Sequence, residues 1–375
     1  MQTTGLRRAV AIIAARTKSS EEWFFAALLL ITVICKFVPF APLMPRGSLD
    51  PSWRFGLNQA VAQGLAFGSD IVFTLGPYAS IVTRDFHPGT DSLMVWGSLY
   101  FSLSFWLAAL LNFRGSNFYL KAAFILTLAS IINSPDSLLI LYPLLVGTHL
   151  FNVTTSMPDG DNVTCRWHVG LVALFAPFGL LPLIKGSSIF SCAAIAALCV
   201  LLLGLRKSWA SVATMCLTPL VSLMLFWVAA GQSLSALPSY LISMLPITSG
   251  YTEAMMISGP ARELWFYITG TVIIVWAIVR GIDAKGSKKA VLPLMFLAAF
   301  FVAFKSGFVR HDVHAMIAGG FILLAALLMN AFITGPRAHI SLIVALATWL
   351  VIDANYLKTS SESVLRSVLS TYSKS

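Results

Sequence analysis

Long apolar runs separated by short polar segments recur along the whole 375-residue chain. A helix needs about 20 apolar residues to cross the roughly 30 Å hydrocarbon core of a bilayer. The runs that approach this length lie at residues 23–43, 93–112, 118–133, 137–152, 168–184, 187–205, 209–229, 264–280, 290–304, 315–333 and 339–353. Only helices and closed barrels satisfy their backbone hydrogen bonds in lipid. The pattern therefore predicts an all-α, polytopic transmembrane helical bundle of about eleven spans.

Composition supports the same class. The chain is 58% hydrophobic and 11% charged, with a mean hydropathy of +0.83, whereas average soluble domains are about 25% charged. The first apolar run is too long for the core of a signal peptide, so we expect it to remain as a helix. Residues 1–353 should form a single bundle, and the Ser-rich residues 354–375 a short polar tail.

The distribution of charge orients this bundle, because basic residues collect on the cytoplasmic side of membrane proteins. With a cytoplasmic N-terminus, the inner segments hold fourteen basic and five acidic residues, and the outer segments hold eleven basic and ten acidic ones. The C-terminus is then extracytoplasmic, and the longest outer loops are 44–92 and 230–263. The formal net charge of +10 thus follows mostly from topology, and a nucleic-acid partner is not expected.

The first outer loop has the pattern of a helix lying along the membrane interface. Trp53, Leu57 and Val61 recur at four-residue spacing within residues 52–66, which predicts one apolar face. Asp50 precedes this helix and is followed by Pro51, as at many helix starts. Its carboxylate is therefore either an N-cap, a role that Asp favours, or a functional acid, and the two roles are compatible.

The segment Lys305–His314 carries five ionisable side chains between two apolar runs, namely Lys305, Arg310, His311, Asp312 and His314. A charge at membrane depth costs roughly 2.5 to 3.5 kcal/mol, so the segment should face a cavity or emerge into water. If residues 310–314 open a helix, Arg310 and His314 share one face and suit a phosphate or diphosphate. The spacing of His311, Asp312 and His314 is a weak metal signal.

Ionisable groups from several distant segments are predicted to share the outer boundary with this cluster. They are Asp50, Asp70, Arg84, Asp85, His87, Asp136, Lys185, Glu253 and Arg262. Lys185 lies between two spans that leave almost no loop, so its ammonium either binds a lipid phosphate or snorkels to the headgroups. Lys36, near the end of the first span, is expected to snorkel outward. The five cysteines are scattered singly and predict neither a metal site nor a disulfide framework.

The order of these parts resembles the GT-C superfamily of polytopic glycosyltransferases. A first span is followed by an outer loop that opens with Asp50, by the interfacial helix, and by the Gly-Pro-bearing segment Phe67–Pro77. The resemblance implies a polyprenyl-phosphate-linked sugar donor as substrate, with Asp50 as catalytic base. It offers Lys185, Lys305, Arg310, His311 and His314 as holders of the lipid phosphate.

The resemblance also bears on the acceptor, a glycan or lipid. Many members carry a soluble outer domain that is missing here, which leaves acceptor recognition to the 230–263 loop. Supporting residues there and in the first loop are Asp70, Arg84, Asp85, Tyr251, Glu253 and Arg262. No resident cofactor is predicted, and a need for a divalent metal stays open. The expected location is the bacterial inner membrane, with the site facing outward and membrane lipids as partners.

Three other functions fit the sequence. An O-antigen polymerase or ligase, which joins glycans from undecaprenyl diphosphate, would use the same basic residues and need no carboxylate in the first loop. A transporter or lipid flippase would place polar groups near the midplane on interrupted helices, whereas here they gather at one face. A structural subunit of an envelope complex is the last alternative.

Overall fold

The computed structural model describes residues 3–131, 134–156, 165–282, 286, 288–356, 369 and 372, without the side chains of 3–19, 134 and 248. Every regular element in this part of the chain is a helix, which confirms the all-α prediction. The predicted tail 354–375 lies almost entirely outside the described residues. The long helices are α1 (Thr3–Phe37), α4 (Asp91–Phe113), α6 (Ser134–Ser156), α9 (Ser188–Leu205), α10 (Trp209–Ala229), α11 (Leu237–Met255), α12 (Ala261–Gly281), α13 (Lys288–Phe308) and α15 (Pro336–Tyr356). The shorter ones are α2 (Leu49–Ala62), α3 (Ser80–Thr83), α5 (Phe118–Ser130), α7 (Cys165–Phe175), α8 (Pro177–Ile184), the 3₁₀ turn Leu234–Ala236 and α14 (Ala315–Asn330).

Eight helical segments among the described residues are long and apolar enough to cross a membrane. They are α4, α6, the α7–α8 pair, α9, α10, α12, α13 and α15. The other three predicted runs fall in α1, α5 and α14, of which α5 and α14 have only 13 and 16 residues. The protein is therefore an integral membrane protein by helix length and composition, while the count of eleven spans stays a prediction.

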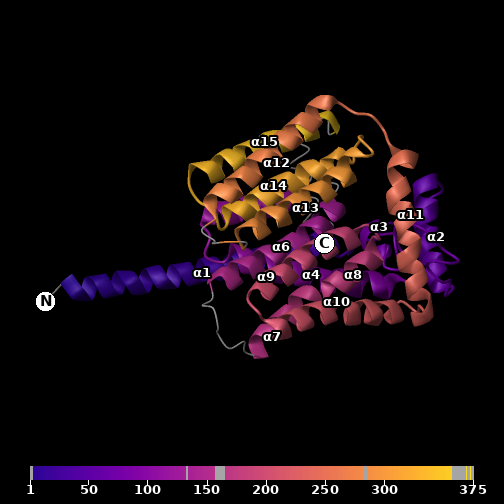
Figure 1. The fold of residues 1–375 in the computed structure, drawn as a ribbon, viewed down its shortest axis with the longest axis horizontal. Coiled ribbons are helices and arrows are strands. Elements are labelled where there is room, and N and C mark those ends of the chain that lie inside the picture. The colour runs from indigo at the N-terminus through magenta and orange to yellow at the C-terminus, as the bar shows by residue number, and fades with distance from the viewer. Residues whose placement is uncertain are drawn as a thin grey trace.

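The spans lie side by side, with α12 to α15 forming one side of the bundle (Figure 1). Every residue of helix α14 from Ala315 to Met329 is buried. It packs against α13, α15, α6 and α5. Its length of 16 residues follows from this position, because a helix surrounded by protein need not span the lipid by itself.

One end of the bundle is covered by α2, α3 and α11, which we call the capped end (Figure 1, right). Helices α2 and α11 lie across this end, and the N-terminal part of α1 projects from the opposite end. The helix predicted in the first outer loop is present as α2, and Trp53, Leu57 and Val61 all pack against the core. The apolar face predicted from their spacing is confirmed.

The predicted outer loop 230–263 contains a helix, α11, that was not predicted from the sequence. Helix α11 buries Leu237, Tyr240 and Met244, at spacings of three and four residues, and Pro238 occupies its first turn. The preceding Gln232 fixes it to the first loop, because its side chain accepts from Phe67 N (3.0 Å) and donates to Leu65 O (3.1 Å). This connection between spans therefore contains regular structure, and α11 is not among the eight described helical segments that are long and apolar enough to cross a membrane.

The segment containing Gly76 packs too closely for any side chain. A Cβ at this position would lie 2.5 Å from the hydroxyl of Tyr240 and would also meet the carbonyl of Leu183. We expect Gly76→Ala to destabilise the protein by about 1 to 3 kcal/mol through overpacking, measured as a lower unfolding temperature. Gly204→Ala on α9 is the matched control, since its Cβ meets nothing within 4 Å; equal unfolding temperatures for both variants would contradict this packing argument.

Candidate functional site

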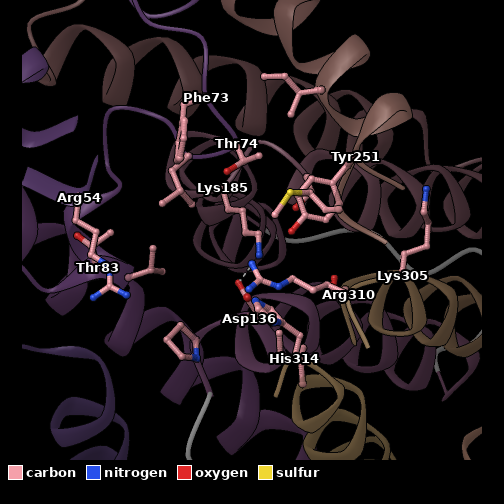
Figure 2. A pocket seen from close by; sticks show the side chains of 18 of the residues that line it. Arg54, Phe73, Thr74, Thr83, Asp136, Lys185, Tyr251, Lys305, Arg310 and His314 are labelled. Carbon is pink, nitrogen blue, oxygen red and sulfur yellow. Dashed lines mark ion pairs between the residues drawn. The ribbon is translucent and has the colours of Figure 1, made fainter. Parts of the chain in front are cut away.

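A cavity of about 2330 Å³ lies at the capped end. It brings together eight of the predicted residues, from segments that are far apart in the sequence: Asp50, Arg84, Asp136, Lys185, Tyr251, Lys305, Arg310 and His314. Figure 2 labels all of these except Asp50 and Arg84. These residues therefore line one cavity, while its place at the outer boundary of the membrane stays a prediction. Its walls also include apolar side chains inside the bundle, such as Phe190 on α9 and Phe301 on α13.

Lys185 is fixed in this cavity by the first loop. Gly186 N donates to Thr74 O (2.9 Å), and Tyr78 N donates to Leu183 O (3.0 Å), so the chain before and after Lys185 is joined to the segment around Gly76. The Lys185 ammonium pairs with Asp136, Nζ to Oδ1 at 2.8 Å. This position inside a cavity favours the binding interpretation over a lysine that snorkels to the headgroups.

The segment 309–314 does not open a helix, which corrects the predicted i, i+4 arrangement of Arg310 and His314. Ile257 pairs with it in extended conformation: Ile257 N donates to Val309 O and His311 N donates to Ile257 O, both at 3.1 Å. Helix α14 begins only at Ala315, after His314. The backbone hydrogen bonds with Ile257 therefore keep this segment extended instead of helical.

Asp312 joins Arg310 and His314 instead. Its Oδ2 accepts from Arg310 Nε at 2.8 Å, and its Oδ1 lies 2.5 Å from His314 Nδ1 and accepts from His314 N at 3.0 Å. Burial raises the pKa of Asp312, but these hydrogen bonds outweigh burial and lower the pKa to about 2. Because the pKa is depressed, Asp312 is ionised at neutral pH, and its contacts with Arg310 and His314 stabilise the folded protein there. This stabilisation is lost only as the pH falls from the usual pKa of 3.8 toward 2.

His311 faces away from the cavity, so the structure separates it from the other predicted phosphate holders. Its ring is buried, with Nε2 2.9 Å from Glu263 Oε2. Glu263 is completely buried and also accepts from Tyr356 OH (3.1 Å) and from the amide of Asn355. Arg262 donates to the same Asn355 and does not line the cavity. These residues hold α12, α15 and the 309–314 segment together.

Asp50 lines the cavity from the first turn of α2. The helix begins at Leu49 with Ser48 as N-cap, so the N-cap role predicted for Asp50 is wrong. Its carboxylate accepts from the indole of Trp53, Nε1 to Oδ1 at 3.1 Å. Among the described residues, no Lys, Arg or His lies within 4.0 Å of it.

Asp70, Asp85 and His87 of the first loop do not line the cavity, and each has a local partner. Asp70 Oδ2 accepts from Ala66 N (2.9 Å) and closes the turn after α2. Asp85 is buried, with Oδ2 4.0 Å from Arg54, and burial raises its pKa. His87 Nδ1 accepts from Gly89 N (3.1 Å), so its Nε2 donates to Gln59 Oε1 (2.9 Å). Glu253, on α11, is exposed and also lies outside the lining.

Two further basic residues line the cavity, although neither was predicted as a site residue. Lys36 does not snorkel outward: it is buried, and Nζ donates to Ile131 O (2.5 Å) and Ala129 O (3.4 Å) at the C-terminal end of α5. Arg54, on α2, is not among the predicted site residues. Its basic side chain on the helix that follows Asp50 is the sequence signal that indicates it.

The donors around His311 and His314 do not converge on a metal position, because the two rings turn to different carboxylates. Within the part of the chain that the structure describes, no group of three or more His, Cys, Asp or Glu side chains could hold a metal ion. All five cysteines are free.

In comparisons with known proteins, no family model, curated protein or solved structure matches the chain.

Proposed function

We propose that the protein is an integral membrane glycosyltransferase of the GT-C type. It transfers a sugar from a polyprenyl-phosphate-linked donor to a glycan or lipid acceptor, at the extracytoplasmic face of a bacterial inner membrane. The observation that carries the proposal is the character of the cavity at the capped end, which joins a cluster of cationic groups to apolar walls within the bundle.

The charge of the cavity supports an anionic, lipid-linked substrate. Its lining holds six Lys or Arg side chains and His314, against only Asp50 and Asp136 as carboxylates. The apolar lining continues along α9 and α13, through Phe190, Ala194, Ala298, Phe301 and Val302. A phosphate among the cations and a prenyl chain along this wall would satisfy both surfaces.

In the proposed reaction, residues that line the cavity take the following roles. The acceptor hydroxyl attacks the anomeric carbon while Asp50 takes its proton, and the bond from that carbon to the phosphate oxygen breaks. Lys185, Lys305, Arg310 and His314 stabilise the charge that develops on the leaving phosphate, which is commonly the larger contribution to such catalysis. Asp50 suits the base because Asp136, the other carboxylate of the lining, is paired with Lys185.

The experiment that tests this role is Asp50→Asn in the purified full-length protein, assayed for sugar transfer from a polyprenyl-phosphate donor. We expect a loss of about 10²- to 10⁴-fold, the range for a general base, with an unchanged unfolding temperature. Glu253→Gln, an exposed acid on α11 outside the cavity, should keep full activity. A folded Asp50→Asn protein with full activity would remove Asp50 from the mechanism.

The excess of basic groups over carboxylates in the cavity favours a second candidate, an O-antigen polymerase or ligase that uses undecaprenyl diphosphate glycans. A diphosphate carries more charge than a phosphodiester, and this enzyme needs no carboxylate from the first loop. Full activity of Asp50→Asn on a diphosphate-linked glycan, together with inactive Arg310 variants, would favour it over the GT-C reaction.

A further inference from the structure

The cavity contains a second group of cations, away from Lys185 and Arg310. Lys36 from the end of α1 and Arg84 from the end of α3 both line it, and Thr83 lies beside them. In Figure 2, Thr83 lies at the left of the view, Asp136 near its centre, and Arg310 and His314 to the right of Asp136. The two ends of the cavity can therefore hold different chemical groups.

The two cationic groups differ in whether carboxylates balance their positive charge. Lys185 and Arg310 each have a carboxylate partner at 2.8 Å. Among the described residues, no carboxylate lies within 4.0 Å of Lys36 or Arg84. The charges of Lys36 and Arg84 also repel each other. Buried charges are normally paired, so this end of the cavity is electrostatically incomplete.

Hydrogen-bonding capacity is also left over at this end. Lys36 has three N–H donors, of which two reach the carbonyls of Ala129 and Ile131. Arg84 donates from one nitrogen to Lys36 O, while its buried Nε has no partner among the described residues. The Thr83 side chain is only 6% exposed, and its Oγ1 also lacks a described partner. Such unsatisfied buried groups are uncommon and call for a ligand or another explanation.

The backbone holds Arg84 in an unusual conformation. Its φ of 58° is left-handed, which is uncommon for a residue with a side chain. Leu43 N donates to Arg84 O (2.7 Å), and Phe86 N donates to Leu43 O (2.8 Å), so the chain after α1 fixes this turn. Burial lowers the pKa of Arg84, in line with a guanidinium that lacks a counterion. Backbone strain of this kind often accompanies functional sites.

We propose that Lys36, Arg84 and Thr83 form a second anion site, which binds a phosphate or carboxylate group of a ligand other than the donor phosphate at Lys185 and Arg310. The anion supplies the missing counter-charge for the two cations and accepts hydrogen bonds from the free donors of all three residues. The group comes either from a soluble ligand or from the headgroup of an anionic lipid. This binding does not depend on the proposed sugar transfer.

Two matched pairs of variants test the site in the full-length protein. Thr83→Val removes the buried hydroxyl of a residue that lines the cavity, and Ser80→Ala removes a neighbouring buried, unpartnered hydroxyl of a residue that does not. Arg84→Gln and Lys36→Met each remove a cation of the site. Lys121→Met removes a buried lysine that pairs with Glu22 (2.5 Å) and is not part of the lining.

The measurement is the increase in unfolding temperature with added ligand, in two arms. The first titrates inorganic phosphate into nanodiscs of phosphatidylcholine, and the second replaces part of that lipid by phosphatidylglycerol. In the first arm, phosphate should bind at least tenfold more weakly to Arg84→Gln and Lys36→Met, and measurably more weakly to Thr83→Val. In the second arm, the increase in unfolding temperature caused by phosphatidylglycerol should be reduced in the same way. Ser80→Ala and Lys121→Met should respond as the wild type does.

The arm that responds identifies the source of the anion, soluble or lipid. Lys185→Gln should retain the part of the response that depends on Arg84, which separates the two cationic groups. If Arg84→Gln does not fold, Thr83→Val against Ser80→Ala decides. A response in neither arm, or one that is equal in Thr83→Val and Ser80→Ala, would overturn the proposal. Because the readout is binding, full activity of Asp50→Asn, which would contradict the proposed catalytic role, leaves this result unaffected.

Discussion

Replacing Arg310 by alanine should lower sugar transfer by about 10²- to 10³-fold, the usual effect of removing one group that stabilises transition-state charge. Arg310 lines the cavity, and Asp312 holds its Nε at 2.8 Å. That contact orients the guanidinium and leaves its terminal nitrogens for a phosphate. A positioned arginine can bind two phosphate oxygens at once, so its loss should act mainly on the turnover number.

The conservative variant separates position from charge. Arg310→Lys keeps the positive charge but cannot reproduce the contact to Asp312 and a two-point contact to phosphate together, so we expect it to recover only part of the activity. Arg337→Ala is the matched control, because Arg337 lies over the ring of Trp276 at 5.8 Å and does not line the cavity. Equal activity of Arg310→Ala and Arg337→Ala would contradict the proposed role of Arg310.

The sequence predicted the bundle because apolar length is a local property. The run at 209–229 coincides with α10, and the run at 187–205 differs from α9 by one residue. Helix α11 was not predictable in the same way. Its apolar positions are interrupted by Ser, Thr and Pro, and its placement depends on contacts between the segment before it and the first loop, such as that of Gln232 with Phe67, 165 residues earlier.

For the site, the sequence predicted which residues lie at the same end of the bundle, but not the directions of their side chains. Charge bias placed Asp50, Lys185 and Arg310 at one boundary, and all three line the cavity. The directions of neighbouring side chains were not predictable, because they depend on Ile257. Pairing with Ile257 extends the chain around Arg310, and successive side chains of an extended chain point to opposite sides. His311 consequently faces Glu263 while Arg310 faces the cavity.

Lys36 shows the same limit for a single charge. A lone lysine near the end of an apolar run is usually a snorkelling residue, and nothing nearby in the sequence indicates otherwise. Its partners are carbonyl oxygens at the end of α5, about 95 residues later. The C-terminal end of a helix attracts cations, so packing of α1 beside α5 turns the lysine inward.

The largest loss of stability should come from Glu263→Ala. Glu263 is completely buried, and its two oxygens contact His311, Asn355 and Tyr356. Alanine would leave all three partners without an acceptor inside the protein. Removing one member of a buried pair costs about 3 to 5 kcal/mol, so we expect a clear fall in the denaturant midpoint of the purified protein. Glu253→Ala, an exposed acid on α11, should be close to neutral.

Glu263→Gln then tests whether the network also positions the site. Glutamine keeps the shape and one acceptor oxygen, so the protein should remain folded. The His311 contact weakens, however, and His311 belongs to the segment that carries Arg310. We therefore expect a lower turnover number with nearly unchanged stability, and a smaller effect at Asn355→Ala, which does not touch this segment directly. If Glu263→Ala unfolds at the same denaturant concentration as Glu253→Ala, the network does not hold α12 to the 309–314 segment, and the position of Arg310 must depend on the backbone pairing with Ile257 alone.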